Sequence, residues 1–334
     1  MRFRVKESSL KKSSKLKVLF RSNKRTSFLL IIVIILIIVF SLINPIFLEL
    51  ESIMNMVRDI AIVSIISIGM SLVILIGGLD LSVGSSLALS GAIAALTINK
   101  TGSALLAIIV AIVIPSIIGF INGLIIGRAK INAVILTLAM LGICRSLTLV
   151  LLNAQTLRVK NYLFNFLGAE SINVGKANIP YSLFLIIFLF LLFYFILNRS
   201  TFGRRLKAIG GNFSAAKVFG ISTENNILLT YIIVGILVGI GSILMVGRNL
   251  SAAPLAGVGL EFGSITVVIL GGASLNGGKL DLKGTFLGVI LLAILISGLS
   301  FSNVLVYYID IVKGILLMIS IAINSTIERY QAEY

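Results

Sequence analysis

The sequence has no histidine, a single cysteine and only 12 acidic residues against 28 basic ones. Without histidine, no imidazole can bind a metal or relay protons. The one cysteine, Cys144, lies within an apolar stretch, so no disulfide can form inside one chain. The remaining sequence shows no cluster of metal-ligating residues and no pair of nucleophile and base. We therefore expect no metal centre, no cofactor and no catalytic residue in this chain.

Long apolar runs dominate the sequence. Hydrophobic residues make up 58% of the chain, charged residues 12%, and the mean hydropathy is +1.13. This composition is typical of a membrane protein with several spans rather than a soluble protein. A net charge of +16 would also suit a nucleic-acid-binding protein, but ten of the 28 basic residues precede Ser27 and most others lie in short loops. We therefore expect a lipid bilayer, and no nucleic acid, as a partner.

A glycine-rich stretch, GGASLNGGKL at 271–280, is only superficially similar to a phosphate-binding loop. The GxxxxGK[ST] frame that ends at Leu280 requires glycine where Ala273 stands and serine or threonine where Leu280 stands. No other stretch is a candidate for nucleotide binding. If ATP drives this protein, a partner chain must bind and hydrolyse it.

Ten apolar stretches predict ten transmembrane helices, and hence an all-α polytopic membrane protein. The expected spans are 27–48, 59–79, 81–99, 103–127, 131–157, 179–198, 226–247, 262–278, 284–303 and 305–327. The first is longer than the apolar region of a signal peptide and lacks a cleavage site, so we interpret it as retained. The glycine-rich eighth is also compatible with half a span. Residues 1–26 then form a basic cytoplasmic tail, 27–327 the membrane domain, and 328–334 a second cytoplasmic tail.

The distribution of basic residues predicts that both termini face the cytoplasm of a cell-membrane protein. With the N-terminus inside and an even number of spans, the loops 128–130, 199–224 and 279–283 are also inside. Twenty basic residues then lie on the cytoplasmic side and six outside, in agreement with the positive-inside rule.

Glycines recur at four-residue spacing in three of the spans. They are Gly119, Gly123 and Gly127, then Gly235 and Gly239, and finally Gly284 and Gly288. Small residues at this spacing let helix backbones meet within lipid. Because chance matches are frequent in glycine-rich apolar sequence, the pattern indicates packing faces and not a function.

A polar stretch, 199–224, separates two apolar blocks that carry no charge. Within it, Asn212 is a suitable N-cap, Phe213–Phe219 is long enough for about two helical turns, and Gly220 is a suitable left-handed stop. The stretch therefore predicts a short, capped helix in a loop outside the bilayer.

The neighbours of this helix favour docking to another protein. We expect Gly210 and Gly211 to interrupt the preceding helix, and the small side chains of Ala215 and Ala216 to allow close approach of another backbone. The alternative is a loop whose basic residues serve only as a topology signal.

An acidic residue, Asp80, lies between the glycine pair Gly77-Gly78 and a run of small residues. It can cap the next helix at the membrane edge by accepting backbone N–H bonds. Acidic residues inside a membrane also mark transport pathways. Both interpretations remain open at this point.

Arg145 lies near the middle of the predicted span 131–157. A charge at the bilayer centre costs about 3 kcal/mol on insertion scales, so a partner is required. The candidates are Asp80, Glu261 or backbone carbonyls that line a wet cavity. The alternatives are a structural ion pair, or a span that ends early so that the guanidinium reaches the outer surface.

Several motifs occur in the order found in a known family. They are GGLDLSVG at 77–84, the dipeptide Asn122-Gly123, ILTLAMLGICRSL at 135–147, GRRLKAIGGNFSAAKVFGI at 203–221 and VVILGGASLNGG at 267–278. Together they resemble the permease subunits of bacterial monosaccharide ABC importers, of the ribose, xylose and galactose type. The resemblance covers nearly all of the chain from about Ile31 onward.

The resemblance implies a membrane permease that imports a monosaccharide and is not itself an enzyme. It implies three protein partners: a second permease subunit, identical or related, a cytoplasmic ABC ATPase that binds the ATP, and an extracytoplasmic sugar-binding protein. The polar stretch 199–224 then corresponds to the loop that couples to the ATPase.

The resemblance also assigns residues. The coupling residues it implies are Gly203, Arg204, Gly210, Gly211, Asn212, Ala215, Ala216 and Gly220. The candidates for the translocation path are Gly77, Gly78, Asp80, Ser82, Asn122, Thr137, Arg145 and Glu261. The chain departs from the family pattern where Ser214 replaces a usual glutamate, Phe213 replaces a common proline, and Leu280 and Lys283 interrupt a glycine-rich run.

Other substrates and another transporter class stay open. Related permeases carry nucleosides, a furanosyl signalling molecule or branched-chain amino acids, and in such importers the binding protein makes most of the selection. An ion-coupled secondary transporter or a channel would need a coupling site such as several intramembrane acids, and this chain offers few.

Overall fold

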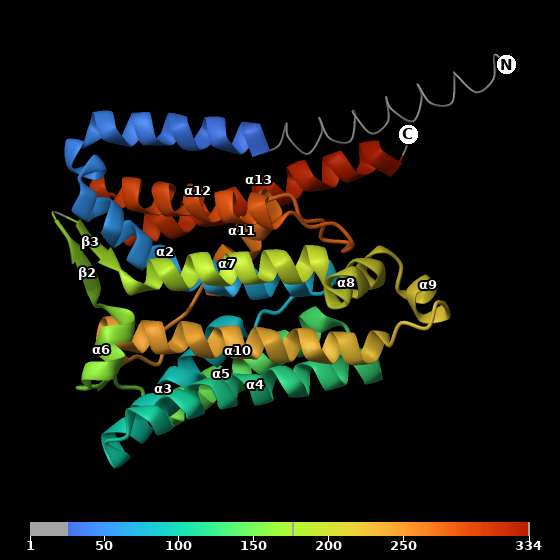
Figure 1. Ribbon diagram of the computed structural model, residues 1–334, viewed down its shortest axis with the longest axis horizontal. Coiled ribbons are helices and arrows are strands. Elements are labelled where there is room, and N and C mark those ends of the chain that lie inside the picture. The colour runs from blue at the N-terminus through green and yellow to red at the C-terminus, as the bar shows by residue number, and fades with distance from the viewer. Residues whose placement is uncertain (1–25, 176, 333–334) are drawn as a thin grey trace.

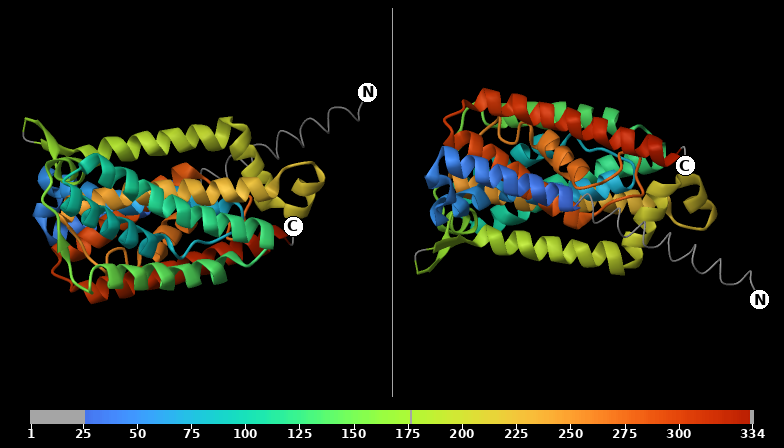
Figure 2. Two further views of the ribbon diagram at one scale, coloured as in Figure 1. Left: turned by 90° about the horizontal axis from the view of Figure 1, so that it is seen from below. Right: turned by 90° about the horizontal axis from the view of Figure 1, so that it is seen from above.

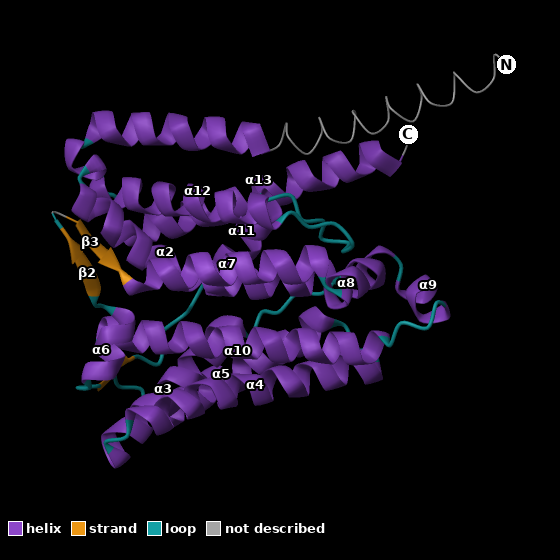
Figure 3. Ribbon diagram, in the orientation of Figure 1, coloured by secondary structure: helices purple, strands orange, loops and turns teal. Residues whose placement is uncertain are grey.

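The computed structural model describes residues 26–175 and 177–332, and most of its helices run along one common direction (Figures 1 and 2). Helices dominate and strands are few and short (Figure 3). In chain order the helical elements are a first helix (Thr26–Ile43), η1 (Pro45–Leu48), α2 (Leu50–Leu75), α3 (Val83–Thr101), α4 (Ala104–Ala129), α5 (Ala133–Leu151), α6 (Tyr162–Gly168), α7 (Tyr181–Arg199), α8 (Thr201–Gly211), α9 (Phe213–Val218), α10 (Thr223–Asn249), α11 (Leu260–Leu270), α12 (Leu282–Phe301) and α13 (Val306–Ala332). The strands are β1 (Leu157–Arg158), β2 (Ser171–Val174), β3 (Ala177–Pro180) and β4 (Ser251–Ala252). The predicted tail 1–26 lies outside the described residues except for Thr26, whereas the predicted tail 328–334 is helical as far as Ala332.

Eight helices of the described chain are long and apolar enough to cross a membrane: the first helix, α2, α4, α5, α7, α10, α12 and α13. The predicted all-α polytopic architecture is therefore confirmed. The other two predicted spans form shorter or less apolar helices. The stretch 81–99 contains most of the serine-rich α3, and 262–278 contains most of α11, which has only 11 residues. At about 1.5 Å per residue, α11 crosses roughly half of the hydrocarbon core.

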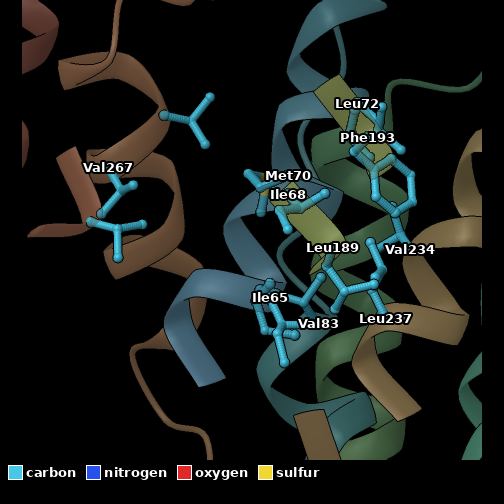
Figure 4. Packing of buried hydrophobic residues seen from close by; sticks show 14 of the residues in the cluster. Ile65, Ile68, Met70, Leu72, Val83, Leu189, Phe193, Val234, Leu237 and Val267 are labelled. Carbon is cyan, nitrogen blue, oxygen red and sulfur yellow. The ribbon is translucent and has the colours of Figure 1, made fainter. Parts of the chain in front are cut away.

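The helix α2 lies at the centre of the bundle. In its most apolar window 78% of the residues are buried, and α2 packs against α7, α10, α11 and α12. Figure 4 shows side chains of α2, α7 and α10 meeting in the core, among them Ile65, Ile68, Met70, Leu72, Leu189, Phe193, Val234 and Leu237. A helix without a free face must be apolar on all sides, which explains why the buried part of α2, from Ile60 to Leu75, carries no charged residue.

The helices α4 and α10 pack backbone to backbone along the predicted glycine faces. A Cβ atom at Gly119 would lie 2.2 Å from the carbonyl oxygen of Tyr231, and one at Gly235 would lie 2.2 Å from that of Pro115. Only glycine allows this approach, which replaces the hydrophobic driving force that lipid does not provide. The prediction that these glycines mark packing faces is confirmed.

Two helices begin inside the protein rather than at its ends. The chain is non-helical at 76–82 before α3 and lacks helix at 250–259 before α11. The N-terminal turn of α3 contacts the second of these segments, since a Cβ atom at Gly84 would lie 2.2 Å from the carbonyl oxygen of Gly257 and 2.5 Å from Oε2 of Glu261. Two helix N-termini therefore meet in the interior, and this meeting point positions the buried polar residues described below.

The two ends of the bundle differ. The helices α8 and α9 protrude at one end, and the other end carries η1, α6 and the β2–β3 hairpin (Figure 1). In that hairpin Ser171 pairs with Pro180 and Val174 with Ala177. The first described helix begins, and α13 ends, toward the end that carries α8 and α9 (Figure 1).

Candidate functional site

The polar stretch 199–224 folds into two consecutive helices. The first, α8, includes Gly210 and has Gly211 as its last residue, so the helix is interrupted at the end of the predicted glycine pair. Glycine in a helix costs about 1 kcal/mol relative to alanine, and contacts outweigh this cost at Gly210. A Cβ atom at Gly210 would lie 1.8 Å from the carbonyl oxygen of Leu75, so glycine is required for contact with α2. Asn212, the next residue, has an extended backbone and separates α8 from α9.

A tight turn connects α7 to α8. The hydroxyl of Ser200 accepts a hydrogen bond from the N–H of Gly203 at 3.1 Å and caps α8. A side chain at Gly203 would collide with the carbonyl oxygen of Leu197, 2.4 Å from an ideal Cβ. Nη1 of Arg204 donates to the carbonyl of Arg199 at 3.1 Å on the exposed surface. Of these two predicted coupling residues, Gly203 is therefore required for the tight turn, and Arg204 lies on the exposed surface of that turn.

The second helix, α9, agrees with the predicted capped helix. Oδ1 of Asn212 accepts a hydrogen bond from the N–H of Ala215 at 2.9 Å, and Gly220 has the left-handed φ of +77°. The helix ends at Val218, with Phe219 as its cap. The cap and the stop are confirmed, and the helix is one residue shorter than predicted.

The outward face of α9 differs from the expected small face. The side chain of Ala216 is only 3% exposed, because the chain turns back after Gly220 and the N–H of Ile221 bonds to the carbonyl of Ala216. In contrast, Val218 is 85% and Phe219 84% exposed. Large apolar side chains, not Ala216, therefore point away from the protein at this end.

Three segments that are distant in sequence meet beneath α8. The N–H of Gly278 donates to the carbonyl of Leu75 at 2.9 Å, which joins the α11–α12 loop to the end of α2. A Cβ atom at Gly277 would lie 2.8 Å from the N of Gly77 and 2.9 Å from the carbonyl oxygen of Gly210. Backbone thus packs directly against backbone where three segments meet: the end of α2, the end of α8 and the α11–α12 loop. We call this meeting point the glycine junction.

Asp80 lies just beyond this junction, buried with only 3% of its surface exposed. Its Oδ1 accepts hydrogen bonds from the backbone N–H of Ser82 at 2.8 Å and from the hydroxyl of Ser82 at 2.6 Å. Nδ2 of Asn122 on α4 donates to the Ser82 hydroxyl at 3.2 Å, and Thr137 on α5 accepts from the N–H of Leu81 at 3.1 Å. Asp80 is thus an interior residue bonded to Ser82, in a turn that α4 and α5 hold through Ser82 and Leu81, and not a cap at the membrane edge.

A small cavity adjoins this group and is lined in part by Asp80, Ser82, Asn122 and Tyr231. Its volume of about 10 Å³ has room for roughly one water molecule. Oδ1 of Asn122 and the hydroxyl of Tyr231 are buried and have no hydrogen-bond partner among the described residues. A single water between these groups would satisfy them. In this conformation the cavity is too small for a sugar or an amino acid.

Arg145 is held by backbone carbonyls, one of the predicted solutions. Its Nη1 donates to the carbonyl of Pro254 at 2.5 Å and to that of Ala256 at 2.9 Å, both in the segment before α11. Glu261 is 6% exposed, and its Oε1 accepts from the N–H of Gly259 at 3.2 Å. Within the described chain Arg145 forms no ion pair, so charge-assisted bonds to carbonyls balance its desolvation.

The structure places the predicted path residues in two adjacent groups. Gly78, Asp80, Ser82, Asn122 and Thr137 surround the α2–α3 turn, Arg145 and Glu261 lie beside the segment 250–259, and Gly77 belongs to the glycine junction. Sequence reasoning missed Tyr231 and the carbonyls of Pro254 and Ala256. The only signal for Tyr231 was a single hydroxyl-bearing ring in a long apolar span. Within the described residues, no group of three or more acidic or cysteine side chains is positioned to hold a metal.

Comparisons with known proteins agree with this architecture. Residues 52–321 match the family described as branched-chain amino acid transport system / permease component. The chain is 37% identical to the ribose import permease protein of Bacillus subtilis, over 86% of this chain and 88% of that protein. It is 33% identical to the ribose import permease protein of Escherichia coli K12, over 86% and 89% of the two chains, and 30% identical to the L-arabinose ABC transporter permease protein of Azospirillum brasilense, over 84% and 82%.

No solved structure matches the chain. The family match covers most of the sequence, including α2 to α12, and contains both the α8–α9 loop and the buried polar groups. This chain belongs to the family of ABC-importer permease components, and it is an integral membrane protein.

Proposed function

We propose that this chain is the membrane-spanning permease of an ATP-driven importer for a monosaccharide, of the pentose or hexose type. The observation that carries the proposal is the 33–37% identity, over 86% of the chain, to proteins named ribose import permeases. The arabinose relative supports a pentose further. The chain itself transports and does not catalyse, and the ATP is bound by a separate ATPase.

The α8–α9 loop is the proposed contact with that ATPase. Phe213, Val218 and Phe219 are exposed large apolar residues on a short rigid helix at one end of the bundle. Fully desolvated aromatic and aliphatic anchors carry most of the energy of an interface. The surrounding basic residues, such as Arg204 and Lys217, steer the approach of the ATPase more than they bind it.

The other partners fit the remaining surfaces. An extracytoplasmic binding protein would dock at the end that carries α6 and the β2–β3 hairpin. Only 22% of the apolar window of α5 and 11% of that of α13 is buried within the chain. We propose that a second permease subunit, either a copy of this chain or a related chain, covers part of these apolar surfaces.

The translocation path is proposed to run past the two buried polar groups. Hydroxyl, amide and carboxylate groups of Ser82, Asn122 and Asp80 are suited to an uncharged, hydroxyl-rich substrate. Because the cavity beside them has room for about one water, the structure corresponds to a closed conformation. Opening requires the two meeting helix N-termini, of α3 and α11, to separate.

The family description also names branched-chain amino acids, and this substrate is the second candidate. A decisive test reconstitutes the permease with its ATPase and binding protein in liposomes. We expect ATP-dependent accumulation of radiolabelled ribose or a related monosaccharide, and none when the ATPase is omitted and an ion gradient is imposed. Accumulation of leucine without any monosaccharide would contradict the proposed substrate, and uptake driven by the ion gradient alone would contradict the transporter class.

A further inference from the structure

A second cavity lies between the N-terminal part of α2 and the C-terminal part of α12. Its volume is about 270 Å³, far larger than the cavity beside Asp80. It lies near η1, since the ring of Phe301 on its wall packs edge to face against Phe47 of η1 at 6.0 Å. This position is at the end of the bundle opposite α8 and α9 (Figure 1).

Two buried serines face this cavity without partners. Ser52 of α2 is 6% exposed and Ser297 of α12 is 7% exposed, and neither hydroxyl has a hydrogen bond within the described chain. Buried serines in helices usually bond to the backbone one turn earlier. Ser64 does so with the carbonyl of Ile60 at 2.8 Å, and Ser320 does so as well. The free hydroxyls of Ser52 and Ser297 are therefore available to a molecule in the cavity.

The polar rim adds further groups but no net charge. Oδ1 of Asn55 accepts from Arg58 at 2.5 Å, which leaves the amide NH₂ of Asn55 as a donor. Asp59 forms an ion pair with Arg248, which neutralises its carboxylate. No lysine or arginine lines the cavity, which excludes the usual chemistry of phosphate or carboxylate recognition.

Ser300 also lines the cavity, but its hydroxyl donates to the carbonyl of Ile296 at 2.9 Å, and the remaining walls are apolar: Met56, Ile296 and Phe301. Apolar walls with a few convergent hydroxyl and amide groups are typical of small-molecule sites. At about 270 Å³ the cavity is just below the size range of sites for drug-sized ligands, and therefore fits a small one. The combination calls for a small, uncharged ligand that presents several hydroxyls and one apolar face.

We propose that this cavity binds a polyhydroxylated group through Ser52 and Ser297. Its source is either a free monosaccharide or the glycerol headgroup of a membrane lipid, which share this chemistry. For a free monosaccharide, the cavity would be a resting position before the buried polar groups, and this role rests on the proposed function.

The test uses the full chain in nanodiscs, without ATPase, and measures the midpoint of thermal unfolding. In phosphatidylcholine nanodiscs, we expect added ribose to raise the midpoint saturably if the source is a free sugar. If the source is a headgroup, phosphatidylglycerol in the nanodisc should raise the midpoint instead and should weaken the effect of ribose. Because this assay needs neither ATPase nor transport, it can detect binding in the cavity even if the liposome assay shows no uptake. Equally, the liposome assay can show uptake even if no ligand binds in this cavity.

The double variant Ser52→Ala, Ser297→Ala removes both free hydroxyls and enlarges the cavity only slightly. We expect the ribose or phosphatidylglycerol concentration for half of the effect to rise about tenfold. Ser320→Ala is the matched control, because it removes a buried helical hydroxyl that is bonded to Leu316 and lies away from the cavity. A ligand effect that is absent from the wild type in both kinds of nanodisc, or that is equal in the double variant, would overturn the proposal.

Discussion

At the scale of single residues, Arg145 shows how a membrane protein accommodates a guanidinium without an acid. Two carbonyls from the segment before α11 accept its hydrogen bonds, and that segment is non-helical, so those carbonyls are not engaged in a helix. The arginine and the irregular segment therefore satisfy each other. This pairing also fixes the position of Gly257 against the start of α3.

Replacing this guanidinium should be costly. We expect Arg145→Leu to lower the free energy of unfolding by about 1–3 kcal/mol, because the carbonyls of Pro254 and Ala256 lose their donor. Sugar uptake by the Arg145→Leu variant should fall as well. Thermal unfolding in detergent and uptake in liposomes measure the two effects. Arg204→Leu is the control for the unfolding measurement alone, since Arg204 bonds to a carbonyl on the exposed surface; an equal loss of unfolding free energy in the two variants would mean that Arg145 only reaches toward the surface.

The sequence allowed much of the site to be predicted, residue by residue, but not its partners. Asp80 and Arg145 stood out because charge in an apolar run has few explanations. The carbonyls that hold Arg145 carry no sequence signal, since every residue has one. The burial of Ala216 depends on where the chain turns after Gly220, which composition does not determine. Tyr231 acquires its role only because α10 packs against α4.

At the scale of elements, the glycine junction links α8 to the end of α2 and to the α11–α12 loop. The end of α2 leads directly to Asp80, and the α11–α12 loop contacts the same carbonyl of Leu75. Because close-packed contacts transmit displacement with little slack, a movement of α8 must move both neighbours. The junction therefore offers a short mechanical route from the α8–α9 loop to the interior.

Two adjacent glycines provide a sharp test of this route. Gly210→Ala places a methyl group 1.8 Å from the carbonyl oxygen of Leu75. We expect this overpacking to lower the free energy of unfolding by about 1–3 kcal/mol and to abolish uptake. The ATPase should still copurify, since α9 is unchanged. Gly211→Ala meets open space and should behave as the wild type. Normal sugar-stimulated ATP hydrolysis and uptake in Gly210→Ala would show that the junction carries no signal.

The outward face of α9 makes a second prediction. We expect Val218→Asp together with Phe219→Asp to abolish copurification of the ATPase, because a charged pair replaces the two most exposed apolar anchors of α9. The free energy of unfolding should change by less than about 0.5 kcal/mol, as for substitutions at most exposed positions. Ser214→Glu adds one negative charge to the same helix and should leave copurification intact. If the ATPase still copurifies with the double variant, another surface must bind it.

The accuracy of the predicted elements follows from their environment. Long lipid-facing helices such as α4 and α7 were predicted because each must be apolar for its full length. The stretches 81–99 and 262–278 were predicted as spans, the second also as half a span, because apolar or glycine-rich residues continue beyond α3 and α11 at 76–82 and 271–278. Their irregular backbone is tolerated because other helices cover it and supply its hydrogen-bond partners.

At the scale of the whole molecule, the described ends of the chain lie toward α8 and α9, and the β2–β3 hairpin lies at the other end (Figure 1). Ser9 and Tyr334, which are suitable for testing on which side the two termini lie, are outside the described residues. Exposed positions within the structure can replace them.

We expect Ile172→Cys, in the hairpin, to react with an impermeant maleimide on intact cells. Val218→Cys, in α9, should react only after the membrane is permeabilised. Both side chains are exposed, at 39% and 85%, whereas native Cys144 is 1% exposed and should stay silent. The reverse labelling pattern would place the α8–α9 loop outside the cell and would contradict an ATPase at that loop.

The short length of α11 has a consequence for how the protein is made. A helix of 11 residues that includes Glu261, Ser264 and Thr266, and that follows an irregular stretch, is too short to cross the bilayer as an independent membrane helix. It must be held in the bilayer by its neighbours, which are α2 and the later-synthesised α12 and α13. A Cβ atom at Gly288 of α12 would lie 2.5 Å from the carbonyl oxygen of Val267, so part of this support forms only after α11 has been synthesised. A chain that stops after Leu270 should therefore insert α11 less completely than a chain that also contains α12.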